Sequence, residues 1–189
     1  MKKAFSLALL SAAILSLTAC GTDSSSSAEG TTDTQNQQDV TFATEMIPHH
    51  QQAVQMAELA QSQAASTAVK DLADQIQAAQ GPEIDTMTGW LKAWGEDVPD
   101  PSMGGMDMGE SESMPGMMSD QAMNDLSAAS GETFDRMWLE SMIAHHEGAV
   151  EMAATEIADG SDAGAISLAR TIKAAQKAEI ATMKKLLAS

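Results

Sequence analysis

The chain has 189 residues, with 27 Asp and Glu against 10 Lys and Arg, and a formal net charge of −17. Such a surface repels nucleic acid and anionic lipid, so we expect no nucleic-acid partner. Cysteine occurs once, which excludes disulfides within the chain and metal sites built from several cysteines. Tyrosine is absent and other aromatic residues are few, so Ala, Leu, Ile and Met must fill the core, which favours closely packed helices.

The first twenty residues are typical of an export signal. Lys2 and Lys3 precede an apolar run over residues 4–17, which is too short for a stable membrane span but suits a signal peptide. The run ends in Leu17-Thr18-Ala19-Cys20, which resembles a lipobox. We therefore expect residues 1–19 to be removed and Cys20 to be lipidated, rather than Cys20 to follow an ordinary signal peptide by chance. The lipid would anchor the mature chain to the extracytoplasmic face of a bacterial membrane, in the periplasm or at the cell surface.

The segment from Gly21 to about Asp39 contains Ser, Thr, Gln, Asp and Gly with almost nothing apolar. It buries too little surface to offset the entropy of ordering. We expect residues 20–39, the lipidated cysteine included, to form a disordered tether, and residues 40–189 to form the folded body. Removal of Lys2 and Lys3 leaves 8 basic residues against 27 acidic ones, a net charge of −19.

An internal repeat divides the body. Met46-Ile47-Pro48-His49-His50 recurs, 96 residues later, as Met142-Ile143-Ala144-His145-His146. The same shift, without a gap, maps Leu72, Ile76, Gln80, Glu83 and Met87 onto Leu168, Ile172, Gln176, Glu179 and Met183. The body therefore arose by duplication. Its units are residues 40–94 and 132–189, joined by a connection over 95–131.

Each unit is predicted to form a helical hairpin. In the first unit Met46, His49, Ala53, Met56 and Ala60 recur at steps of three and four residues, which is a helical period. A break near residues 62–67 precedes a second helix over about 68–93, and Pro82 inside it should bend the helix or open one hydrogen bond. In the second unit residues 159–162 supply the break, with a C-terminal Gly and capping residues. We expect an all-α, antiparallel four-helix bundle built from two tandem hairpins, plus a short helix over about 119–129.

All four histidines of the chain lie in the two doublets. Met46 and Met142 precede their doublets by three and four residues, so each can converge with an imidazole on one side of its helix. Thioether sulfur favours Cu(I) and Ag(I), and imidazole suits copper in both oxidation states as well as zinc. We interpret His49, His50, His145, His146, Met46 and Met142 as candidate metal ligands, although Met at such positions is also ordinary core.

The connection between the units holds six further methionines in a Gly-, Pro- and Ser-rich loop. Glycine lets the backbone bend around an ion, so several sulfurs can converge. The alternative is a hydrophobic loop that packs over the bundle. We predict additional soft-metal ligands at Met103, Met106, Met108, Met114, Met117 and Met118.

Glu83 and Glu179 are the only carboxylates at equivalent places in the two second helices. Each could accept a hydrogen bond from an imidazole and fix its tautomer. Helix caps or surface positions would explain them equally well.

The sequence resembles domain of unknown function family 305, a CopM-like family. The resemblance is carried by residues 46–57 and 134–153, which contain both doublets, and it extends over roughly residues 40 to 188. It implies a ferritin-like helical bundle in an exported protein, and in some members copper binding that limits metal toxicity. By that analogy the two His doublets, Met46 and Met142 are the positions expected to bind copper. Ala144 departs from Pro48 of the first copy without removing a ligand.

The sequence thus predicts an extracytoplasmic lipoprotein that binds copper, and not an enzyme. Its partners would be metal ions and, through Cys20, the membrane; no organic cofactor is expected and no protein partner is indicated. A metal-independent surface interaction protein is the alternative. A di-iron oxidase needs carboxylates from four helices, typically with Glu-x-x-His on two of them, and neither doublet has a Glu three residues before it. The doublets give no reason for a haem site, and no nucleophile is paired with a base.

Overall fold

The computed structural model describes residues 34–100 and 114–189, which form five helices and no strand. Several predicted features lie outside the described residues. They are the leader, Cys20, most of the tether, and the loop methionines Met103, Met106 and Met108. The helices are α1 (Gln37–Gln63), α2 (Thr67–Trp94), α3 (Asp120–Ala128), α4 (Gly131–Asp159) and α5 (Ala163–Leu187). The all-α prediction is confirmed, and in residues 34–100 and 114–189 no helix is long and apolar enough to cross a membrane.

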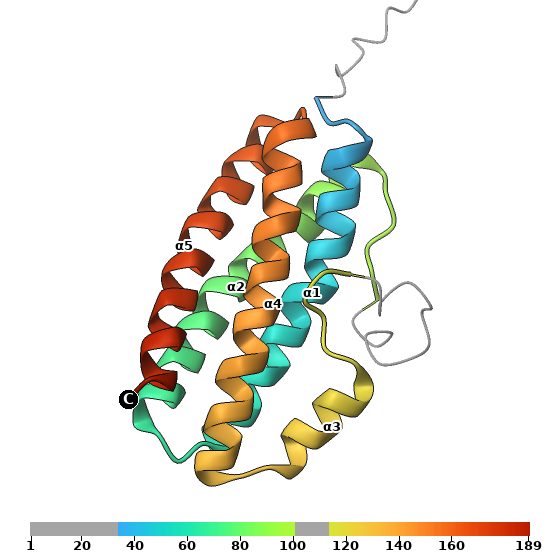
Figure 1. Cartoon of the computed structure of the whole chain (residues 1–189). Helices are drawn as coiled ribbons and strands as arrows, with labels where there is room; N and C mark the ends of the chain where they lie inside the picture. The colour runs from blue at the N-terminus through green and yellow to red at the C-terminus, as the bar shows by residue number, and fades with distance from the viewer. Residues whose placement is uncertain (1–33, 101–113) are drawn as a thin grey trace, which may run out of the picture. The chain divides into compact units, whose positions relative to one another are not determined.

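The four long helices form two hairpins that pack together (Figure 1). Helix α1 packs along α2, helix α4 packs along α5, and α1 and α4 join the two hairpins. The short helix α3 contacts α1 and α4, and it buries Leu126 completely while Met123 packs at the edge of the core. The structure thus has the bundle, the short extra helix and the two breaks that the sequence predicts. Helix α2 runs through Pro82 to Trp94 as one helix.

Helix α1 begins before residue 40, so the end of the expected tether belongs to the bundle. Asn36 is the N-cap: its side chain accepts hydrogen bonds from the backbone N–H groups of Gln38 and Asp39. The Asp39 side chain accepts in return from the N–H of Asn36. This capping box, with Asp in place of the usual Glu or Gln, outweighs the polar composition of the segment.

Asp39 and its counterpart 96 residues on, Asp135, tie the two hairpins together. Asp39 accepts hydrogen bonds from the N–H groups of Ser161 and Asp162, at the start of α5. Asp135 accepts from those of Ala65 and Ser66, at the start of α2. Each first helix therefore holds the residues that lead into the second helix of the other unit, and the duplication has produced a reciprocal clamp.

The apolar core consists of two clusters of buried side chains, one on each side of the histidines. The first contains α1 residues from Ala53 onward and α4 residues up to Met142. The second contains α1 residues up to Ile47 and α4 residues from Ala149 onward. Because residues before one doublet pack with residues after the other, α1 and α4 run antiparallel. The four histidines form a polar layer between the clusters.

Candidate metal-binding site

The histidine layer is closed to solvent. His49, His50 and His146 have no exposed surface, and His145 is 1% exposed. An imidazole buried this deeply ordinarily has both ring nitrogens hydrogen-bonded. Among the described residues, five of the eight ring nitrogens have no such partner: Nδ1 of all four histidines and Nε2 of His145.

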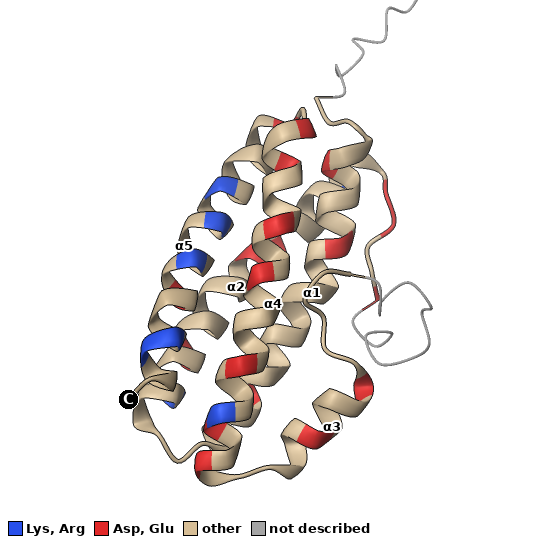
Figure 2. Cartoon of the chain, viewed as in Figure 1, with Lys and Arg blue, Asp and Glu red and all other residues tan. Residues whose placement is uncertain are grey.

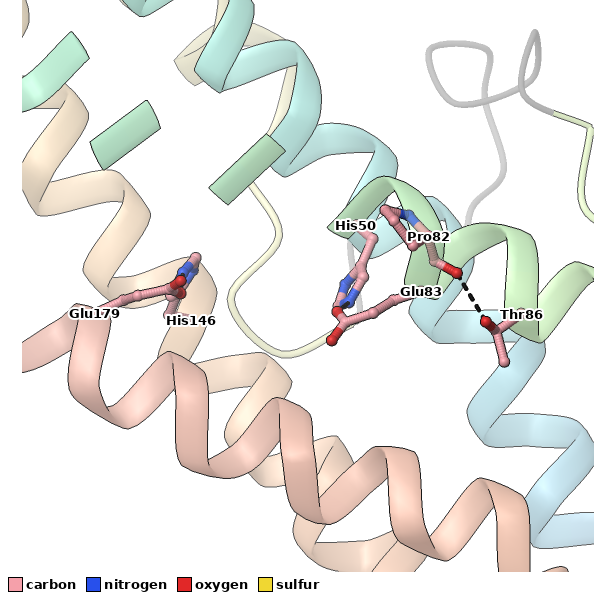
Figure 3. A network of polar contacts seen from close by, with 6 residues as sticks. All are labelled: His50, Pro82, Glu83, Thr86, His146 and Glu179. Atoms are coloured by element: carbon pink, nitrogen blue, oxygen red, sulfur yellow. Dashed lines mark hydrogen bonds and ion pairs between the residues drawn. The ribbon is translucent and has the colours of Figure 1, made fainter. Parts of the chain in front are cut away.

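His50 and His146 each contact a glutamate of the neighbouring helix in their own hairpin. Nε2 of His50 lies 2.8 Å from Oε2 of Glu83 on α2, and Nε2 of His146 lies 2.8 Å from Oε2 of Glu179 on α5 (Figure 3). A carboxylate oxygen only accepts, so the proton of each neutral imidazole resides on Nε2 and the lone pair on Nδ1. The contact anticipated for both glutamates is present, while their effect on metal binding stays a prediction.

His49 and His145 face each other across the interface between α1 and α4. Their ring centroids are 3.8 Å apart, with an angle of 40° between the ring planes. Nε2 of His49 lies 3.1 Å from the carbonyl oxygen of Pro115, another group that only accepts. The proton of His49 is therefore also on Nε2, which leaves Nδ1 as the lone-pair donor.

Burial keeps both facing imidazoles neutral. It lowers the pKa of His49 to about 3, opposed by the hydrogen bond to Pro115 and aided by His50 and His146, whose protonated forms would repel a second positive charge. Burial and the neighbouring histidines likewise hold the pKa of His145 well below its ordinary value. A neutral imidazole keeps the lone pair that a metal ion requires, so these two donors are available even in mildly acidic surroundings.

The predicted thioether ligands of the bundle lie on opposite sides of the histidine layer. Met46 is fully buried in the cluster that contains Phe42, and Met142 is fully buried in the cluster that contains Trp138. Each lies one helical turn before its doublet, where a side chain reaches the same face of the helix. Both positions fit core packing and ligation alike. Met56 and Met152 are also buried in the core.

The second half of the Met-rich loop lies against the same layer. Met114, Met117 and Met118 are partly buried, and Met118 packs against the first core cluster. The contact of Pro115 with His49 places this segment over the doublets. The sequence did not point to Pro115, because its carbonyl carries no signal in the amino-acid pattern. The first half of the loop lies outside the described residues.

Imidazole, thiolate and carboxylate groups do not by themselves assemble a metal site among the described residues. In residues 34–100 and 114–189, no three His, Cys, Asp or Glu side chains come together in a way that could hold a metal ion. A metal site that used these imidazoles would need further donors, and thioether sulfur is available at Met46, Met142 and the Met114–Met118 segment. Such a neutral, soft donor set fits Cu(I) or Ag(I) better than a hard cation.

Comparison with known proteins agrees with this architecture. The family described as a domain of unknown function (DUF305) matches residues 39–187. A DUF305 protein from Streptomyces coelicolor is 35% identical, with a TM-score of 0.70 over 80% of this chain and 92% of that one. A DUF305 fragment from Deinococcus radiodurans is 31% identical, with a TM-score of 0.72 over 82% of this chain and 97% of that one.

The protein CopM is similar as well. Its Cu(II)-bound form is 34% identical, with a TM-score of 0.67 over 79% of this chain and 95% of that one. Solved forms of CopM with Cu(I) and with Ag also match, at TM-scores of 0.64 and 0.63. No curated protein matches the chain.

Proposed function

Since the chain belongs to the DUF305 family, we propose that it binds copper, Cu(I) foremost with Ag(I) and Cu(II) as further cargo, through its histidines and methionines. The observation that carries this proposal is the buried layer of four imidazoles whose Nδ1 atoms have no partner among the described residues. An unpaired polar atom in the interior costs about 1–3 kcal/mol, and ligation would relieve that cost.

The donor chemistry supports a soft ion. The imidazoles of His49 and His145 are held neutral, and thioether sulfur carries no charge, so an ion bound there keeps its own positive charge. A monovalent ion loses less hydration energy than a divalent one on entering such an interior. The existence of CopM in Cu(I)-, Cu(II)- and Ag-bound forms supports the same class of ion for this chain.

Surface charge would assist capture without providing selectivity. Acidic side chains are spread over α1, α2, α3 and α4, while most of the basic ones lie on α5 (Figure 2). With a net charge of −17 the chain raises the local concentration of all cations. Selectivity for copper must therefore come from the buried donors.

We further propose an extracytoplasmic role in copper sequestration and tolerance, with the chain anchored through a lipidated Cys20. The leader and lipobox carry this part of the proposal. The similarity to a DUF305 protein named as a secreted protein supports the location. Metabolic labelling with a radioactive fatty acid would test the anchor: Cys20→Ser should abolish incorporation, and undiminished labelling of that variant would refute it.

A binding protein fits the layer better than an enzyme does. A di-iron oxidase requires carboxylates from four helices around the metals. At this level α1 and α4 supply imidazoles, and Glu83 and Glu179 are each engaged by an imidazole Nε2. A metal-independent interaction protein is the second candidate, and the unpaired Nδ1 atoms argue against it because a purely structural histidine would have partners.

Competitive titration of Cu(I) against a chromophoric chelator tests the proposal on the chain from residue 22 onward. We expect the unmodified protein to remove Cu(I) from the chelator. A variant with the four histidines changed to Gln tests the bundle donors, and a variant with the six loop methionines changed to Leu tests the loop. Met56→Leu with Met152→Leu is the matched control for buried methionines outside the predicted ligand set, and circular dichroism checks each fold.

Loss of competition in the histidine variant assigns the tight site to the bundle, and loss in the loop variant assigns it to the loop. If the unmodified protein does not compete, the copper proposal is wrong and the interaction protein becomes the leading candidate.

A further inference from the structure

The segment over the histidine layer is a tight turn of defined type. The N–H of Met117 donates to the carbonyl of Met114 at 3.3 Å, with Pro115 and Gly116 between them. Gly116 has φ +80°, and Pro followed by such a Gly is the signature of a type II turn. In this type the central peptide is flipped relative to a type I turn. That peptide contains the Pro115 carbonyl that accepts from His49.

Two glycines let this turn approach helix α4 at backbone distance. A Cβ atom on Gly148 would lie 1.9 Å from the carbonyl oxygen of Pro115, and one on Gly116 would lie 2.5 Å from the carbonyl oxygen of Ala144. Neither distance is tolerable for a side chain, so both positions require glycine. The turn is thus seated in a gap on α4, one helical turn or less from His145 and His146.

Helix α1 holds the other end of the segment through one side chain. Oε1 of Gln52 accepts from the N–H of Met118 at 2.8 Å, and Nε2 of Gln52 donates to the carbonyl of Met118 at 2.9 Å. Gln52 is 8% exposed, and it uses both ends of its amide on one residue of the segment. It lies two residues after His50 in the sequence.

Gln52 and Gly148 occupy equivalent positions in the duplicated units, 96 residues apart. The doublets, Met46 and Met142, and the glutamates on α2 and α5 match between the units. At the Gln52 and Gly148 positions the units differ, and both of these residues contact the Met114–Met118 segment. This difference between the units has a structural reason. A single segment lies across two equivalent helices, α1 and α4, and it contacts each of them with a different part of its backbone.

We propose that Gln52 is a positioning residue for metal binding: it holds the Met114–Met118 segment over the histidine layer so that its thioethers act together with the imidazoles. This inference rests on the proposed function. A segment already fixed in place loses little conformational entropy when an ion binds, whereas a free Gly- and Met-containing segment must be ordered at that moment.

The test replaces Gln52 by Leu, which keeps the side-chain volume and removes both hydrogen bonds. Gln61→Leu is the matched control: Gln61 is also on α1 and also donates to a backbone carbonyl, that of Lys70, but lies at the far end of the helix. Each change is also made in a background with Met114, Met117 and Met118 changed to Leu. Cu(I) affinity is measured by competition, and amide hydrogen exchange of Met118 is measured without metal.

We expect Gln52→Leu to speed the exchange of the Met118 amide and to weaken Cu(I) binding about tenfold, with Gln61→Leu unchanged in both. In the triple-Leu background Gln52→Leu should have no further effect on affinity, because the sulfurs that it positions are gone. A merely structural role would weaken binding in both backgrounds.

An unchanged Cu(I) affinity in Gln52→Leu overturns the inference, and so does an equal loss in the triple-Leu background. Unchanged exchange of the Met118 amide overturns it independently of any metal. If the unmodified protein fails to bind Cu(I), the proposed function itself fails. That outcome differs from binding that does not depend on Gln52.

Discussion

Asp39 and Glu156 bring two buried carboxyl groups together at the end of the bundle where α1 begins and α4 ends. Burial, the hydrogen bond to Asp39 and the charge of Asp39 raise the pKa of Glu156 to about 8. Burial also acts to raise the pKa of Asp39, but hydrogen bonds from the Asn36, Asp162 and Ser161 N–H groups and from Glu156 lower it overall. At neutral pH Glu156 therefore carries the shared proton and Asp39 carries the charge.

This pair predicts that stability falls as the pH rises toward 8. A pKa raised from 4.5 to about 8 means that the folded chain holds a proton that the unfolded chain has released. The proton's contribution to the free energy of unfolding is complete below about pH 4.5. Between about pH 4.5 and 8 that free energy falls by up to about 1.4 kcal/mol per pH unit, and above pH 8 the contribution is lost. Glu156→Gln should remove this slope from the free energy of unfolding, measured with urea between pH 5 and 9.

The control for this prediction is Glu151→Gln, an exposed glutamate on the same helix. It should keep the slope of the unmodified protein. If the Glu156 and Glu151 variants show the same dependence on pH, Glu156 does not hold the proton.

The reciprocal clamp makes a second prediction, at the other end of the bundle. Asp135→Ala removes the acceptor for the N–H groups of Ala65 and Ser66. Leaving these two backbone N–H groups without their carboxylate acceptor should lower the free energy of unfolding by about 1–2 kcal/mol. Chemical denaturation measures the change, with the exposed Asp125→Ala on α3 as the reference. Equal stabilities of the two variants would show that the clamp contributes nothing.

The 96-residue repeat made much of the fold and of the site predictable. It placed the doublets on equivalent helices and singled out Glu83 and Glu179, which both contact the imidazoles of their own hairpins. Asp39 and Asp135 are also 96 residues apart, but they lie before residues 46–50 and 142–146, where the repeat is recognisable. The cap at Asn36 was missed because its segment is polar in composition.

Gln52 and Gly148 could not have been found in this way. The repeat identifies residues that agree between the units, and these two differ. Their importance comes from a segment more than sixty residues from Gln52 and about thirty from Gly148 along the chain, which meets them only in the folded protein. No local pattern in the sequence encodes that contact.

The contacts of Glu83 and Glu179 with His50 and His146 make a third prediction. Changing both to Gln keeps the side-chain shape but removes the carboxylate that accepts from Nε2 and fixes the imidazole orientation. By comparison with other metal sites, copper affinity should fall about 10- to 100-fold. Competitive Cu(I) titration measures it, and Glu58→Gln with Glu151→Gln, both exposed on α1 and α4, provides the control. Unchanged affinity would make the glutamates structural partners only.

Gly148 provides the fourth prediction, because α4 has no room for a side chain at that position. A Cβ atom would lie 1.9 Å from the carbonyl oxygen of Pro115, so Gly148→Ala must displace the turn and break its hydrogen bond with His49. Overpacking of this kind costs about 1–3 kcal/mol, which urea denaturation would measure. Gly89→Ala on α2 is the opposite case, since nothing lies within 4 Å of its Cβ.

The two substitutions should therefore change stability in opposite directions. Ala in place of an unconstrained helical Gly stabilises by roughly 0.5–1 kcal/mol, so Gly89→Ala should raise the free energy of unfolding. Hydrogen exchange of the Met117 and Met118 amides should speed up only in the Gly148 variant, because only that change displaces the turn from α4. If Gly148→Ala is as stable as Gly89→Ala and exchanges as slowly, the segment is not packed against α4.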